Sequence, residues 1–148
     1  MKTPASIRDH PIHPILVSLP IGLLVFSLVA DIIYLVSNSA VWQTVAFYTL
    51  AGGIVTALIA AVPGFIDLLS IHEPKLKRVG LTHMTLNLLA VMIFAIDWWL
   101  RLRHATDART TFILSFVGVI FISVSGWLGG TLVHRYRVSV EERNLQSS

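Results

Sequence analysis

The sequence predicts an all-α integral membrane protein, a bundle of four helices with antiparallel neighbours. Its 148 residues are 55% hydrophobic and only 13% charged, whereas charged residues make up roughly a quarter of a soluble domain. Four apolar segments reach the roughly 20 residues that a helix needs to span a bilayer. They lie at about 14–36, 41–69, 81–100 and 111–132. We therefore expect one four-span domain over residues 1–148, followed at its end by a polar tail, 135–148.

The cations predict which side of the membrane each end of the chain faces. The connection after the second segment carries Lys75, Lys77 and Arg78, whereas the first connection, at 37–39, has no charge. By the positive-inside rule, both termini face the cytoplasm. The third connection carries arginines as well and weakens this prediction without reversing it. The net charge of +3 is then explained by topology, and we expect a lipid bilayer and no nucleic acid as partner.

Two histidines precede the first apolar segment, and each of the other three segments has a polar residue at the end that lies on the same side of the membrane. His10 and His13 precede the first apolar run, Asp67 closes the second, His83 opens the third and His134 closes the fourth. Because neighbouring helices are antiparallel, these ends lie on the same side. The sequence thus predicts one histidine-rich pocket near the cytoplasmic face.

The chemistry of this pocket has three interpretations. Neutral imidazole binds haem iron and divalent metals, and the chain has no cysteine, which excludes thiolate ligands. The first is a b-type haem with one axial ligand from His10 or His13 and one from His83 or His134, with Asp67 orienting an imidazole. The second is a divalent metal ion held by His10, His13, His83 and Asp67. In the third, the protein is a packing or assembly subunit whose histidines bind nothing. The glycines expected to make room for a macrocycle are Gly64, Gly126, Gly129 and Gly130.

A second polar group is predicted at the opposite end of the bundle. Asp97 and Arg101 are four residues apart in the third segment, and Asp31 lies at a similar depth in the first. A buried ion-pair network is the expected arrangement. The alternative is a small proton or solute transporter with a path from Asp31 or Asp97 to the histidines.

The second segment contains Pro63-Gly64, which predicts a kink and a carbonyl one turn earlier that needs a partner inside the bundle. There is also a pattern of duplication. The sequence from Gly64 to Asp67 resembles that from Gly126 to Gly129, and His13 with Asp31 resembles His83 with Asp97. Two parallel copies of a helical hairpin would be related by a pseudo-two-fold axis along the membrane normal.

Taken together, these motifs resemble a bacterial membrane family catalogued as domain of unknown function 2231. The resemblance is carried by the paired His-Pro motif at 10–14, by Gly64 to Leu68, by His83 and by Ser125 to Val133. It covers nearly the whole chain and implies a four-span protein of the bacterial inner membrane. Some relatives look to be joined to Rieske-type iron–sulfur domains, which implies electron transfer with a redox partner. A homo-oligomer is the other partnership we expect. The resemblance implies no particular enzymatic reaction.

Overall fold

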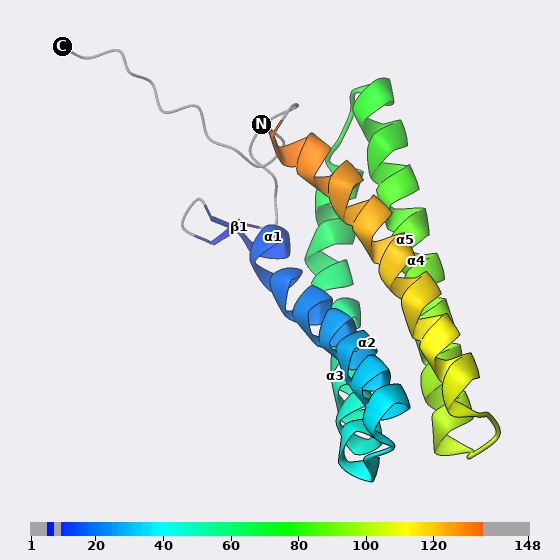
Figure 1. The fold of residues 1–148 in the computed structure, drawn as a ribbon. Helices are drawn as coiled ribbons and strands as arrows, with labels where there is room; N and C mark the ends of the chain where they lie inside the picture. Colours follow the sequence, from blue (N-terminus) through cyan, green and yellow to red (C-terminus); the bar gives the residue numbers. More distant parts are fainter. Residues whose placement is uncertain (1–5, 8–9, 135–148) are drawn as a thin grey trace.

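The computed structural model describes residues 6–7 and 10–134, and the surroundings of side chains from residue 12 to residue 133. Five helices account for nearly all of it, and a two-residue antiparallel hairpin precedes them (Figure 1). The elements are β1 (Ser6–Ile7), β2 (His10–Pro11), α1 (Ile12–Leu16), α2 (Ser18–Ser37), α3 (Ala40–Leu69), α4 (Pro74–Leu102) and α5 (Ala108–His134). Because α1 and α2 continue one another, the described chain has four helices long and apolar enough to cross a membrane. The prediction of an all-α four-helix membrane bundle is confirmed.

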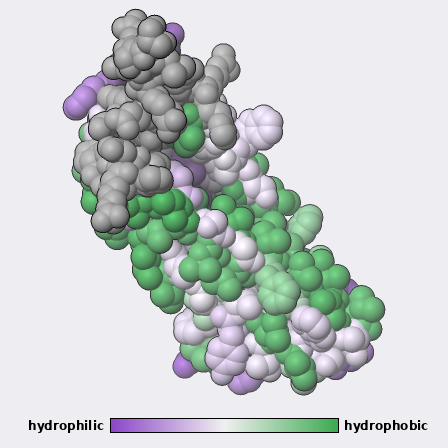
Figure 2. All heavy atoms as spheres, turned by 90° about the vertical axis from the view of Figure 1, so that its left-hand side faces the viewer, coloured by the Kyte–Doolittle hydropathy of each residue, from purple (hydrophilic) through white to green (hydrophobic). Residues whose placement is uncertain are grey.

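The outer surface of the bundle is apolar. Large hydrophobic side chains point outward all along the helices, and Val36 and Trp127 are 84% and 80% exposed. Figure 2 shows hydrophobic side chains covering most of the middle of one face and hydrophilic ones gathering at its lower end. Monomeric soluble proteins rarely expose continuous apolar surface of this extent. The surface is therefore suited to hydrocarbon, and the chain is a multi-pass membrane protein.

Two of the helices, α4 and α5, begin where a carboxylate accepts hydrogen bonds from their first N–H groups. The Glu73 carboxylate accepts hydrogen bonds from the backbone N–H of Lys75 and Leu76, at 3.3 and 2.9 Å, and Pro74 suits the first helical position. For this reason α4 begins well before the predicted start at residue 81. At α5, Asp107 Oδ1 accepts from the Thr110 N–H at 2.7 Å.

The first span is interrupted for one residue between α1 and α2. Pro20 has no N–H to give to the carbonyl of Leu16, four residues earlier. The chain stays helical across the break, because the Val17 N–H bonds to the His13 carbonyl at 3.1 Å and the Ile21 N–H to the Val17 carbonyl at 3.3 Å.

The four spans form two helical hairpins, and glycines bring the helices of each hairpin close together. A Cβ on Gly53 of α3 would lie 2.6 Å from Cδ2 of Leu24 in α2, and a Cβ on Gly118 of α5 would lie 2.5 Å from Cζ of Phe94 in α4. Leu24 and Phe94 also meet in the middle of the bundle, in a cluster with Leu50, Ala90 and Ile122. The first hairpin, α1 to α3, thus packs against the second, α4 and α5.

The two ends of the bundle differ in what they contain. We call the end where α1 begins and α5 ends (Figure 1) the histidine end, because His13 lies in α1 and contacts His83 of α4. The opposite end contains Asp31, Asp97 and Arg101, and we call it the arginine end.

Candidate functional site

A cavity of about 440 Å³ lies between the two hairpins, towards the histidine end. All five helices contribute to its lining, which consists mainly of apolar side chains and glycines. The polar side chains that line it are those of His13, Asp67, His83 and Asn87. A mostly apolar cavity with a few convergent polar groups is typical of a ligand or cofactor site.

His13 projects from α1 towards the turn of α3 that precedes Pro63. Its Nδ1 lies 2.8 Å from the carbonyl oxygen of Ala60, three residues before Pro63, which interrupts the hydrogen bonding of the helix there. The ring fits against Gly64, where a Cβ would come within 2.7 Å of its Nδ1 and Cε1. His13 thus bonds to the carbonyl next to that of Ile59, which is the one that Pro63 leaves without its helical N–H.

His83 is held in the same way by α5, with additional polar partners. Its Nδ1 lies 2.7 Å from the carbonyl oxygen of Ser125 and 2.9 Å from the Ser125 hydroxyl, which donates to the His83 carbonyl at 3.0 Å. Asn87 Nδ2 lies 3.1 Å from His83 Nε2. A Cβ on Gly129 would come within 2.9 Å of the ring.

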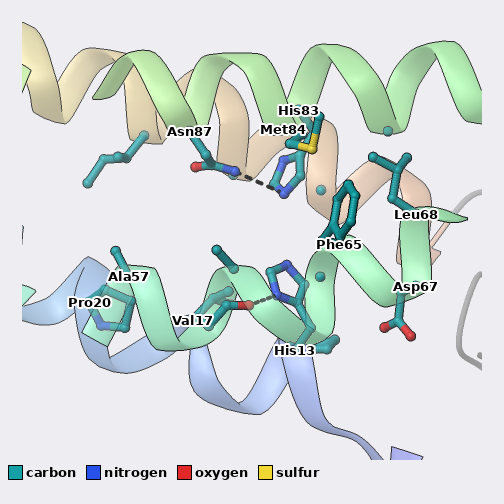
Figure 3. A pocket seen from close by; sticks show the side chains of 18 of the residues that line it. His13, Val17, Pro20, Ala57, Phe65, Asp67, Leu68, His83, Met84 and Asn87 are labelled. Carbon is teal, nitrogen blue, oxygen red and sulfur yellow. Dashed lines mark hydrogen bonds between the residues drawn. The ribbon is translucent and has the colours of Figure 1, made fainter. Parts of the chain in front are cut away.

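The two rings face one another across the cavity, with centroids 6.2 Å apart and planes at 85° (Figure 3). Because a carbonyl only accepts hydrogen bonds, each ring carries its proton on Nδ1 and a lone pair on Nε2. Asn87 donates to the Nε2 of His83. Within the described part of the chain, the Nε2 of His13 has no hydrogen-bond partner. His13 and His83 thus converge as predicted, and each presents a basic nitrogen.

The other predicted site residues have different outcomes. The side chains of His10 and His134 lie outside the described residues. Asp67 lines the cavity and is buried, but in Figure 3 its carboxylate points away from both rings. The backbone carbonyls of Ala60 and Ser125 orient the rings of His13 and His83, and the orienting role of Asp67 stays a prediction.

The predicted glycines also divide into two groups. Gly64 and Gly129 make room for the histidine rings themselves. Gly126 and Gly130 line the cavity, and a Cβ on either would meet nothing within 4 Å. Among the described residues, no group of three or more His, Asp or Glu side chains is placed to hold a metal ion.

Sequence reasoning missed the roles of Asn87 and Ser125. A signal for Asn87 was present, because it is the one amide side chain in the third apolar segment and lies one helical turn after His83. Ser125 acts mainly through its backbone carbonyl, which its residue type does not reveal.

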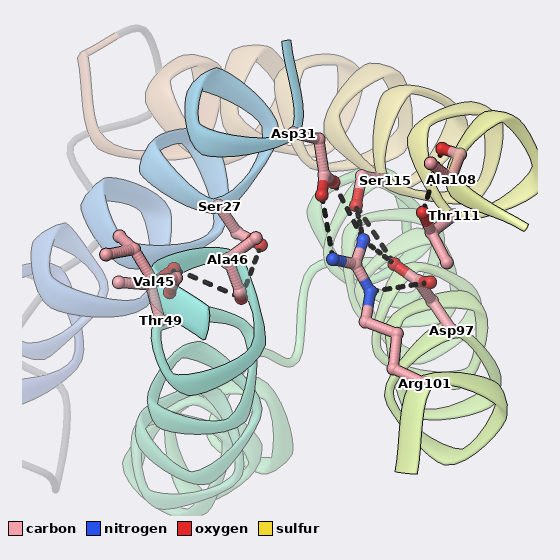
Figure 4. Close-up of polar contacts among 10 residues, drawn as sticks. All are labelled: Ser27, Asp31, Val45, Ala46, Thr49, Asp97, Arg101, Ala108, Thr111 and Ser115. Carbon is pink, nitrogen blue, oxygen red and sulfur yellow. Dashed lines mark hydrogen bonds and ion pairs between the residues drawn. The ribbon is translucent and has the colours of Figure 1, made fainter. Parts of the chain in front are cut away.

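At the arginine end, Arg101 bridges the two hairpins (Figure 4). It donates to both carboxylate oxygens of Asp31 at 2.7 Å and to those of Asp97 at 3.0 and 2.9 Å. Ser115 donates to Asp97 at 2.9 Å. These three charged side chains are 8% exposed or less. The predicted buried ion-pair network is confirmed.

The predicted proton path has little to support it between the two ends. Asp97 and His83 are 14 positions apart on α4, about 21 Å at 1.5 Å per residue. The space between them contains the apolar cluster around Phe94 and Leu24. A proton relay needs closely spaced polar groups, and both carboxylates are already bonded to Arg101.

The two hairpins repeat one another in a fixed register. The histidine and the large apolar side chain are 11 positions apart in both (13 and 24; 83 and 94), and so are the glycines opposite them (64 and 53; 129 and 118). Equivalent positions in α1–α2 and α4 thus differ by 70, which is the separation of Asp31 from Arg101. The equivalent pairs contact each other, His13 with His83 and Asp31 with Arg101, as expected around a pseudo-two-fold axis along the bundle.

This register corrects the duplication read from the sequence. Gly64 is equivalent to Gly129, not to Gly126, and Asp31 is equivalent to Arg101, not to Asp97. Two glycines are equivalent when they face equivalent side chains. A short similarity in sequence does not show which side chain a glycine faces.

A family model described as a predicted membrane protein (DUF2231) matches residues 9–142. No curated protein and no solved structure matches the chain.

Proposed function

We propose that this chain, which belongs to the DUF2231 family of predicted membrane proteins, holds one b-type haem between its two hairpins and carries electrons in the membrane. The proposed axial ligands are His13 and His83. The observation that carries the proposal is the pair of imidazoles, one from each hairpin, with centroids 6.2 Å apart beside an apolar cavity. A bound haem supplies one-electron redox chemistry.

The proposal takes a haem rather than a bare metal ion because a haem needs fewer donors from the protein. A protein site for zinc or a similar ion takes three or four side-chain ligands. A haem brings four nitrogens of its own and needs at most two from the protein. The described residues bring two imidazoles together and no third metal-binding side chain.

The spacing of the rings and the hydrogen bonds to their Nδ1 atoms support the proposal. The centroid separation of 6.2 Å would leave room for one metal ion between the rings, since a metal–nitrogen bond is about 2 Å. Metal-binding histidines nearly always donate their other N–H to a carbonyl or carboxylate, which fixes the ring and makes the ligating nitrogen more basic. Ala60 and Ser125 accept these bonds here.

Asn87 makes the two ligands unequal. It donates to His83 Nε2, whereas the equivalent position in the first hairpin is Val17. Ligation by His83 would require Asn87 to release this nitrogen, whereas no described side chain bonds to the Nε2 of His13.

The proposal is tested by absorption spectroscopy of the protein purified after expression with a haem supply. We expect a Soret band with one haem per chain, and at least a tenfold lower occupancy in His13→Ala and in His83→Ala. His72→Ala and His104→Ala, which replace exposed histidines, serve as controls and should keep the band. A wild-type protein without a Soret band contradicts haem binding. Bound metal in elemental analysis would then favour the ion site, and neither would favour the packing subunit.

We also propose that both termini lie on the cytoplasmic side of a bacterial inner membrane, because Lys75, Lys77 and Arg78 lie in or beside the connection at the histidine end. The chain has no cysteine. A single introduced cysteine is therefore its one site of maleimide labelling, and the labelling reports on which side of the membrane that position lies. A membrane-impermeant maleimide added to intact cells should label Ala105→Cys and should label Lys75→Cys only after the cells are broken. The reverse labelling would show the opposite orientation.

A further inference from the structure

The first turns of α4 form a patch of positive charge at the histidine end of the bundle. Lys75, Lys77 and Arg78 are all exposed there, and the connection from α3 together with these turns contains one acidic residue, Glu73. The Glu73 carboxylate accepts hydrogen bonds from the first N–H groups of the helix. Three cations and one anion give this segment a net charge of +2 with histidine neutral. Such a patch attracts anionic headgroups at a membrane surface.

Two of these cations lie directly above an apolar face of α4. Lys77 and Arg78 precede Leu81 by four and three residues, so the three side chains are neighbours on the helix surface. Leu88 follows Leu81 after two helical turns and lies on the same face. Leu88 also belongs to the lining of the cavity. This face of α4 thus begins with two cations and continues with leucines.

The neighbouring helix α3 provides a second apolar face at the same level. A Cβ on Gly80 of α4 would lie 2.6 Å from Cδ1 of Leu68, so the end of α3 is level with the first turns of α4. Three apolar side chains of α3 share one face at spacings of seven and four residues, and the first two of them line the cavity. The apolar side chains of the two faces are 43–58% exposed. They are Leu58, Phe65 and Leu69 of α3 and Leu81 and Leu88 of α4.

The opposite side of the cavity, between α2 and α5, is apolar but carries no such charge. Ile21 and Gly126 line the cavity on that side and are exposed as well. The described parts of α1 and α2, and of α5 near the histidine end, contain no lysine or arginine. Charge therefore distinguishes the α3–α4 side from the α2–α5 side.

We propose that an anionic phospholipid binds at the α3–α4 side of the histidine end. Its phosphate lies between Lys77 and Arg78, and one acyl chain runs along the apolar faces of the two helices towards Leu88. An ammonium and a guanidinium both donate charge-assisted hydrogen bonds to phosphate oxygens. A zwitterionic lipid brings a cation of its own, which these two side chains repel.

The dimensions of the site agree with a lipid that lies upright in one leaflet. From Arg78 to Leu88, α4 rises about 15 Å at 1.5 Å per residue. The hydrocarbon core of a bilayer is about 30 Å thick, so one leaflet provides about half of this. The cations therefore lie at headgroup level when Leu88 lies near the end of the acyl chain. The inference does not depend on the proposed haem.

The first test is native mass spectrometry of protein released from nanodiscs that contain equal amounts of phosphatidylglycerol and phosphatidylcholine. The wild type should retain phosphatidylglycerol, and the double variant Lys77→Gln with Arg78→Gln should lower that retention roughly tenfold. Lys77→Arg keeps the charge and should keep the lipid. The matched control is Arg103→Gln with Arg109→Gln, which removes the same charge from exposed positions at the other end. Equal retention in the two double variants would overturn the inference.

The second test locates the acyl chain. Phosphatidylglycerol with a diazirine near the end of one acyl chain, illuminated in nanodiscs with the wild type, should label peptides that contain Leu58 or Leu88. Peptides that contain Ile21 or Gly126 should be labelled less. Equal labelling of the two sides, or equal labelling by phosphatidylcholine with the same diazirine, would overturn the inference. Neither test measures haem, so a failure here leaves the haem proposal standing, and a chain without a Soret band leaves the lipid site standing.

Discussion

Replacement of Arg101 by leucine is expected to lower the free energy of unfolding by about 3–5 kcal/mol, the cost of leaving buried charge without its partner. The guanidinium lies between Asp31 and Asp97 and bonds to all four of their oxygens. Without it, two carboxylates would remain together, at 4% and 0% side-chain exposure. Denaturant titration of the protein in mixed micelles, followed by circular dichroism, measures the change.

The charges of this cluster predict which substitutions are milder. Two carboxylates and one guanidinium carry a net charge of −1, so Asp31→Asn leaves one balanced pair of Asp97 with Arg101. It should therefore cost clearly less than Arg101→Leu. Arg103→Leu is the matched control, because Arg103 is exposed, caps the C-terminal end of the same helix and lies over the ring of Trp99, 6.0 Å from its centroid. If Arg101→Leu and Arg103→Leu are equally stable, the ion pair does not hold the hairpins together.

The sequence was sufficient to predict the spans and the arginine cluster, because both depend on residue type at regular spacing. An apolar run of the right length must be helical in a bilayer, and Asp97 with Arg101 at four-residue spacing must lie on one helix face. The start of α4 was missed because it is set by a local cap, Glu73 with Pro74, within a charged stretch that does not look like a membrane span.

The candidate site was predicted only in part. The convergence of His13 and His83 follows from the antiparallel arrangement of neighbouring helices. The first and third spans then begin at the same end of the bundle. The groups that hold the rings are backbone carbonyls of Ala60 and Ser125, and every residue has a carbonyl. Which one is available depends on the kink at Pro63 and on the register between helices, which are properties of the packed structure.

The second large effect is expected from adding one methyl group to α3. Gly64→Ala places a Cβ where it meets His13 Nδ1 and Cε1 at 2.7 Å. The ring is bonded to the Ala60 carbonyl, so it cannot move aside without losing that bond. Overpacking of this kind typically costs about 1–3 kcal/mol, and the displaced ligand should lower haem occupancy at least tenfold.

A glycine-to-alanine change elsewhere in the bundle should instead raise the free energy of unfolding. Gly22 lies within α2, a Cβ there would meet nothing within 4 Å, and it does not line the cavity. Because alanine loses less backbone entropy than glycine in a helix, Gly22→Ala should stabilise the protein by about 0.5–1 kcal/mol and leave the Soret band unchanged. If Gly64→Ala behaves like Gly22→Ala in both measurements, His13 is not fixed against α3 and cannot serve as an anchored ligand. A loss of stability with unchanged haem content would instead separate the two roles, so that His13 packs the hairpin and a different residue ligates the iron.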